Sequence, residues 1–160
     1  MYRLLEINKI NDKESQSIYP FDDFTAMEAE YETKLGAWMK NESVQAELLV
    51  MLDGSLETLG MAKIGDAELS PRLIEVKTTE TEDVTVSKYD SNYLVSANFH
   101  SKLGAAMKNE AVTVEVLKGV DGNGAELEHR SWIRPVEVPE PQPEPEPTPA
   151  EEEPEEPTEE

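Results

Sequence analysis

The sequence contains no cysteine and only two histidines in 160 residues. The lack of cysteine excludes disulfides, thiolate catalysis and cysteine-ligated zinc, and two histidines argue against a histidine-rich metal site. Basic residues are also scarce, since 14 Lys and Arg stand against 35 Asp and Glu. Because phosphate binding needs clustered Lys and Arg, direct binding to nucleic acid is not expected.

Long apolar runs are missing as well. No segment approaches the roughly eighteen apolar residues of a membrane span, and the first residues lack the hydrophobic region of a secretion signal. We therefore expect a soluble protein of the reducing cytoplasm, with no membrane partner.

The acidic excess is concentrated at the C-terminus. Residues Val136 to Glu160 hold eleven glutamates and eight of the eleven prolines, with no Lys or Arg. Such a segment cannot bury enough apolar area to offset the entropy of ordering, so the sequence predicts a disordered tail over 136–160. A solubilising extension is the plainer interpretation, and an acidic lure for a basic protein surface is the alternative.

The rest of the chain repeats itself. Lys34 to Glu42 recurs as Lys102 to Glu110, with eight of nine residues identical at a spacing of 68. Upstream, Arg3 to Ile7 resembles Arg72 to Val76 at a spacing of 69. Repetition over this range indicates a tandem duplication. The predicted domains are two modules, 1–66 and 67–135, followed by the tail.

The sequence pattern of each module predicts two strands, a helix and two further strands. In the first module, the helix is indicated by apolar residues at steps of three and four, and the third strand by apolar residues at every second position. The predicted fold is α+β, with two ββαββ modules that each carry one helix on a four-stranded antiparallel sheet. The expected segments of the first module are Tyr2 to Ile10, Ser15 to Tyr19, a helical stripe of Phe24, Met27, Tyr31, Leu35, Trp38 and Met39, then Val44 to Leu52 and Leu59 to Ile64.

The helix start has clear signals. Asp22 or Asp23 can cap it, and Thr25 with Glu28 has the spacing of a capping box. In both modules we expect Tyr31, Leu35, Phe99 and Leu103 to be buried between the helix and the sheet.

Two further residues of the helix recur. A glycine inside a helix costs about 1 kcal/mol relative to alanine, so Gly36 and Gly104 predict close approach of the sheet backbone. Asn41 and Asn109 stand where each helix should end, and asparagine tolerates the left-handed conformation of a helix C-terminus.

A second apolar face is present on the sheets. Leu4, Leu49, Leu73 and Leu117 have the opposite strand parity to the main apolar stripes, and they occur at equivalent places in both modules. We identify them as a possible interaction surface. Either the modules pack on each other there as a pseudo-dimer, which we favour, or the leucines form an exposed patch that receives a partner.

Residues that carry chemistry are few. His100 and His129 are not equivalent in the repeat, and neither has a nucleophile at a recognisable spacing. Asp121 to Glu126 superficially suggests calcium ligands, but its Asp-Gly-Asn-Gly start is typical of a tight turn. We therefore predict no catalytic, cofactor-binding or metal-binding residue, and no enzymatic activity.

The repeated Lys-Leu-Gly-Ala-x-Met-Lys-Asn-Glu stretch has two interpretations. Its polar residues are suited to a recognition surface, whereas a recent duplication with the same core demands explains the repeat more plainly. This stretch, the opening Tyr-Arg-Leu-Leu-Glu-Ile-Asn-Lys-Ile and the closing Ser131 to Arg134 resemble small proteins of phages and prophages of gut Firmicutes. Proteins of that group are similar to a single module and have no assigned activity, so the resemblance transfers no site residue.

Two function classes follow from these observations. The first is a noncatalytic phage or prophage accessory protein that binds an unidentified protein in the host cytoplasm, with a minor virion or morphogenesis component as one form. The alternative is an acidic inhibitor of a host defence or nucleic-acid-binding enzyme, which would act as a charge decoy.

Overall fold

The computed structural model describes residues 1–137, 139 and 141–142, and these form two α+β modules, as predicted. Each module has an antiparallel four-stranded sheet and one helix. The tail expected to be disordered lies largely outside the described residues. The elements of the first module are β1 (Tyr2–Ile10), β2 (Lys13–Phe21), α1 (Phe24–Met39), β3 (Val44–Leu52) and β4 (Thr58–Ile64). Those of the second are β5 (Arg72–Thr78), β6 (Glu82–Lys88), α2 (Asn92–Lys108), β7 (Val114–Val120) and β8 (Glu126–Ile133).

The two sheets have the same topology. Their strand orders are β2-β1-β3-β4 and β6-β5-β7-β8, so the first and third strands of each module are central. Equivalent residues pair in both sheets, as Leu4 with Met51 and Leu73 with Gly119 show. No helix among the described residues is long and apolar enough to cross a membrane.

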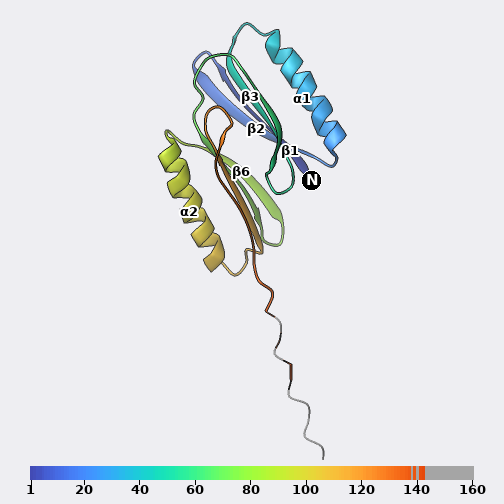
Figure 1. The fold of residues 1–160 in the computed structure, drawn as a ribbon, viewed down its shortest axis with the longest axis vertical. Coiled ribbons are helices and arrows are strands. Elements are labelled where there is room, and N and C mark those ends of the chain that lie inside the picture. The colour runs from blue at the N-terminus through green and yellow to red at the C-terminus, as the bar shows by residue number, and fades with distance from the viewer. Residues whose placement is uncertain (138, 140, 143–160) are drawn as a thin grey trace, which may run out of the picture.

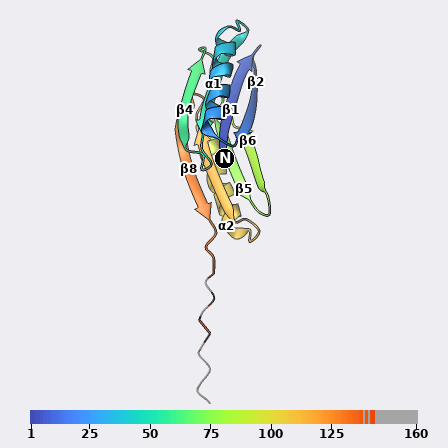
Figure 2. The ribbon, with the colours of Figure 1, turned by 90° about the vertical axis from the view of Figure 1, so that its right-hand side faces the viewer.

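The sheets pack face to face, and the helices lie on the two outer sides (Figure 1). A single core joins the inner faces, with Leu5, Ile7 and Leu48 from the first sheet against Ile74 and Val76 from the second. Viewed at a right angle, β4 and β8 lie on one edge of the molecule and β2 and β6 on the other (Figure 2). The layers are therefore helix, sheet, sheet and helix.

The expected roles of the two sheet faces are exchanged in the structure. Leu4 and Leu49 are fully buried in the core beneath α1, and Leu73 and Leu117 are buried beneath α2. They are neither a contact between the modules nor an exposed patch, so their assignment as an interaction surface is wrong. The main apolar stripe, which includes Ala46, Leu48 and Val50 of β3, instead packs on the other sheet. A sheet covers a wider apolar face than one helix can, which favours this arrangement.

The helical stripe is largely correct. Tyr31, Phe99 and Leu103 are buried against the sheets, whereas Leu35 is half-buried. Met39 departs from the prediction because its side chain is 71% exposed at the last helical position.

The helix ends use side-chain hydrogen bonds. Asp23 caps α1 and accepts a hydrogen bond from the Ala26 amide at 2.8 Å, so the Thr25 and Glu28 capping box is not formed. Asn109 has a φ of −89°, outside the left-handed region. Its Oδ1 accepts from the Ala111 amide instead, as that of Asn41 does from Ser43. These asparagines therefore act through their side chains.

Equivalent five-residue turns join the last two strands of each module. Asp53 Oδ1 accepts from the amides of Ser55 and Glu57, and Asp121 Oδ1 accepts from those of Asn123 and Ala125. Because this oxygen satisfies backbone donors, the acidic start of each segment serves the turn, as expected.

Gly36 and Gly104 do not contact the sheet, contrary to the sequence-based expectation. A Cβ built on either glycine meets no heavy atom within 4 Å, and neither residue has a positive φ.

Replacing either glycine with alanine should therefore raise the free energy of unfolding by about 1 kcal/mol, measured by urea denaturation. Gly122→Ala is the matched control and should destabilise, because its Cβ would lie 1.8 Å from the Leu69 carbonyl oxygen. Destabilisation by Gly36→Ala would contradict the finding that the space beside Gly36 is open.

Candidate functional site

Reciprocal ion pairs connect the two modules. Arg3 pairs with Glu82, and Arg72 Nη2 lies 2.9 Å from Glu14 Oε2. The two arginines are equivalent in the repeat and are almost fully buried. Arg72 also donates to Gln16 Oε1 at 2.5 Å. Paired charges of this kind define one relative orientation of the modules.

A buried carboxylate lies beneath the C-terminal half of α1. Glu6 accepts hydrogen bonds from Tyr19 Oη at 3.0 Å and Trp38 Nε1 at 2.9 Å, and Lys34 Nζ lies 2.9 Å from its Oε2. Burial alone would raise the pKa of Glu6, but Lys34, Tyr19 and Trp38 together outweigh it and lower that pKa. Glu6 is therefore ionised at neutral pH.

Glu47 is the second buried carboxyl group of this cluster. Its side chain is fully buried, and among the described residues neither oxygen has a hydrogen-bond partner. Burial, followed by the negative charge of Glu6, raises the pKa of Glu47 to about 9. It is therefore a neutral carboxylic acid at neutral pH.

The second module repeats this cluster. Glu75 lies 2.5 Å from Lys102 Nζ and 2.9 Å from Lys77 Nζ. Although burial would raise the pKa of Glu75, Lys102, the neighbouring Glu115 and Lys77 together lower it to about 2. Glu115, the equivalent of Glu47, has no hydrogen-bond partner for either oxygen among the described residues. Burial and the neighbouring Glu75 raise the pKa of Glu115 to about 8.

A neutral and an ionised carboxyl group side by side resemble an acid and base pair. Here both pairs are enclosed, since Glu6, Glu47, Glu75 and Glu115 are at most 5% exposed. A substrate could not reach them without displacement of a helix. The clusters are therefore parts of the core, and the sequence signal that could have revealed them is the charged residue on an otherwise apolar strand.

A polar groove lies at the boundary of the modules, beside the N-terminus of α2. Its volume is about 560 Å³, and its wall includes Lys9, Lys63 and Ser91. Lys63 Nζ donates to Asn123 Oδ1 at 2.7 Å across the modules. Its wall carries two basic side chains, Lys9 and Lys63, and four acidic ones, Glu14, Glu68, Asp90 and Asp121, so acidic groups are in excess.

The structure divides the repeated stretch into a buried and an exposed part. Lys34 and Lys102 belong to the carboxylate clusters. By contrast, Met39 is 71% and Met107 is 39% exposed at the ends of the two helices. The neighbouring polar residues, which are also exposed in both copies, are Lys40, Glu42, Lys108 and Glu110.

Comparisons with known proteins found no relative. No protein-family model matches the chain, and neither does any curated protein or any solved structure. The resemblance to small phage proteins therefore stays a prediction.

Proposed function

We propose that the chain is a noncatalytic interaction protein that presents two equivalent binding surfaces to protein partners. Each surface is the exposed helix end, with Met39, Lys40 and Glu42 in one module and Met107, Lys108 and Glu110 in the other. The observation that carries the proposal is the repeated exposure of a methionine at each helix end. As the resemblance implies, we place it among accessory proteins of phages or prophages, with a minor virion or morphogenesis component as one form.

Contacts within the core account for only part of the residue identity between the two copies of the repeated stretch. Lys34 and Lys102 are retained in both modules because each partners a buried carboxylate. Met39 is 71% exposed and Met107 is 39% exposed, so packing in the core does not fully account for a methionine at either helix end. Methionine side chains are flexible and adapt to varied apolar contacts, which suits a binding surface.

The arrangement of the helices favours two separate contacts. α1 and α2 lie on opposite outer sides of the sandwich (Figure 1). Reciprocal ion pairs connect the modules between the two helices. Two equivalent surfaces held in this way suit a protein that bridges two partner molecules, or two sites of one assembly.

Replacing both exposed methionines should weaken partner binding. We expect Met39→Glu combined with Met107→Glu to reduce capture from host lysate at least about tenfold, because a charge would be buried at each contact. Thermal melting should fall only slightly, because Met39 is 71% exposed and Met107 keeps 39% of its surface in solvent. Tyr93→Glu is the matched control, because Tyr93 is 79% exposed on α2 but has no aromatic equivalent in the repeat. Equal capture by the methionine variant and the native protein would refute these surfaces.

Removal of the acidic tail separates this function from a charge decoy. A chain truncated after Pro135 should retain its melting temperature and its partners, and capture should change little between about 50 and 200 mM salt, because apolar contacts are not screened. A decoy that neutralises a basic groove would lose its partner on truncation and weaken by orders of magnitude over that salt range. Such a loss would favour the acidic inhibitor.

A further inference from the structure

The two modules differ at one place in their contact. Four residues of this region are polar or charged, while their repeat equivalents, 68 residues away, are apolar or small. His129, Lys118, Glu126 and Glu57 correspond in this way to Met61, Val50, Thr58 and Ala125. On the equivalent side of the contact, Met61 lies beside Gly124 of the other module, and Lys63 donates to Asn123. One side of the contact is therefore formed around a methionine and a lysine, and the other around two carboxylates and a histidine.

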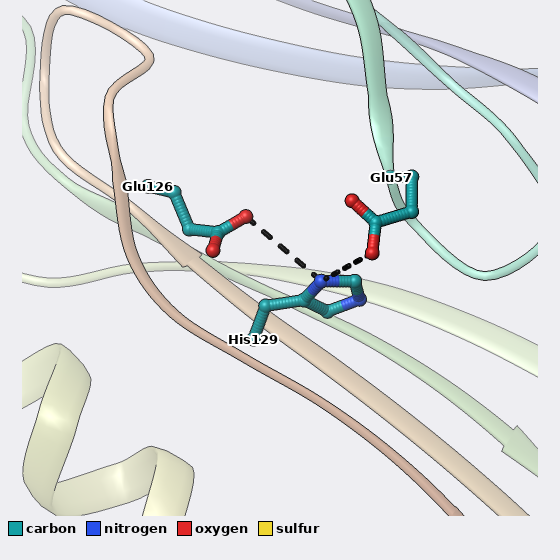
Figure 3. A group of neighbouring side chains, drawn as sticks. All are labelled: Glu57, Glu126 and His129. Atoms are coloured by element: carbon teal, nitrogen blue, oxygen red, sulfur yellow. Dashed lines mark ion pairs between the residues drawn. The ribbon is translucent and has the colours of Figure 1, made fainter.

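Three of the charged groups converge on one point (Figure 3). His129 Nδ1 lies 3.3 Å from Glu57 Oε1 and 3.9 Å from Glu126 Oε2. One ligand atom from each residue lies within 4.8 Å of the other two. Glu126 and His129 come from β8, whereas Glu57 comes from the turn before β4. The cluster thus joins the two modules.

The histidine ring is oriented by a backbone group. His129 Nε2 lies 2.7 Å from the carbonyl oxygen of Ser55, and a carbonyl can only accept a hydrogen bond. Nε2 therefore carries the proton, and in the neutral ring Nδ1 presents its lone pair to the two carboxylates. Metal-binding histidines in proteins are commonly held by this contact between the second ring nitrogen and a backbone carbonyl.

The Glu57 backbone and the Glu126 carboxylate are positioned as well. The Glu57 amide donates to Asp53 Oδ1 at 2.9 Å, and the Glu57 carbonyl accepts from the Asp53 amide at 3.0 Å, which holds the backbone of the turn. Glu126 Oε2 accepts from Lys118 Nζ at 2.5 Å, and Lys118 is fully buried. The Glu126 carboxyl group keeps further lone pairs for a cation.

We propose that Glu57, Glu126 and His129 form a divalent transition-metal site, suited to Zn²⁺, that connects the two modules. A tetrahedral site with ligand bonds of about 2.1 Å places neighbouring ligand atoms about 3.4 Å apart. The 3.3 Å between His129 and Glu57 already meets this requirement, and the half-exposed Glu126 side chain has only to move slightly. A mixed nitrogen and carboxylate set favours Zn²⁺ over Mg²⁺ and Ca²⁺, which prefer oxygen ligands. Water would complete the coordination.

Charge supports the same assignment. Glu57 and Glu126 bring two carboxylates to the cluster and Lys118 brings one ammonium group, so the carboxylates are in excess. A cation at the centre offsets this excess. The site departs from the sequence-based expectation that no residue binds metal, because Glu57 is far from Glu126 and His129 in the chain.

Zinc titration of the full chain tests the site. We expect one saturable equivalent by calorimetry at pH 7.5, and a raised melting temperature because only the folded protein assembles the three ligands. His129→Ala and Glu57→Gln should each weaken binding at least about tenfold. His100→Ala is the matched control, since it removes the other histidine of the chain. It should leave the affinity unchanged.

Nuclear magnetic resonance of the two imidazole rings gives a second readout. On addition of zinc, the His129 ring signals should shift while those of His100 stay in place. The proposal is overturned if zinc binds the native protein and the His129→Ala variant equally, because the tail carboxylates would then account for binding. It is also overturned if His129 stays an imidazolium at pH 7.5 in saturating zinc, since the cluster would then be an ion-paired contact only.

Discussion

Replacing Leu49 or Leu117 with alanine should lower the free energy of unfolding by about 2 to 5 kcal/mol. Both side chains are fully buried between a sheet and its helix, and they are equivalent in the repeat. Each substitution leaves a cavity that the helix and sheet cannot fill without repacking. Denaturation by urea, followed by circular dichroism, measures the change.

The matched control for these variants is Leu59→Ala. Leu59 is on the edge strand β4 and is 43% exposed, so its truncation should cost much less than that of Leu49. If all three variants unfolded at the same urea concentration as the native protein, the helices could not be packed on the outer faces through Leu49 and Leu117.

Stability should fall as pH rises from about 5 to 8. In the unfolded chain Glu47 and Glu115 ionise near 4.5, whereas burial holds the pKa of Glu47 at about 9 and that of Glu115 at about 8 in the folded protein. The folded state therefore binds more protons in this range. The stabilisation is complete below pH 4.5. As pH rises from there to the folded pKa values, each group loses up to about 1.4 kcal/mol of stabilisation per pH unit.

Neutral side chains at both positions should remove this dependence. We expect Glu47→Gln combined with Glu115→Gln to be more stable than the native protein at pH 8, with similar stability at pH 5. Glu28→Gln, on the exposed face of α1, is the control and should keep the native pH profile. Parallel profiles for the double variant and the native protein would mean that these carboxyl groups are ionised in the fold.

Much of the fold could be predicted from local patterns. β1 spans Tyr2–Ile10 as expected, Asp23 caps α1, and the strand-strand-helix-strand-strand order holds in both modules. These features depend on nearest neighbours along the chain: the periodicity of apolar residues, a capping side chain and turn residues.

The candidate sites were harder to predict. The repeated stretch drew attention to Lys34 and Met39, but only burial separates the lysine beneath the helix from the methionine in solvent. Glu47 and Glu115 lie on the strand face opposite the main apolar stripe, and strand parity alone does not say that a helix covers that face.

By itself the sequence determined the duplication, the order of elements in each module, the lack of thiol chemistry and the acidic composition of the tail. The tertiary structure alone decided which sheet face meets the helix and which meets the other module. Both faces of β1 and β3 carry apolar residues, so strand parity separates the two faces without saying which one meets the helix. The tertiary structure also brought Glu57 to His129, because contacts between segments far apart in the chain depend on how the sheets pack rather than on local sequence.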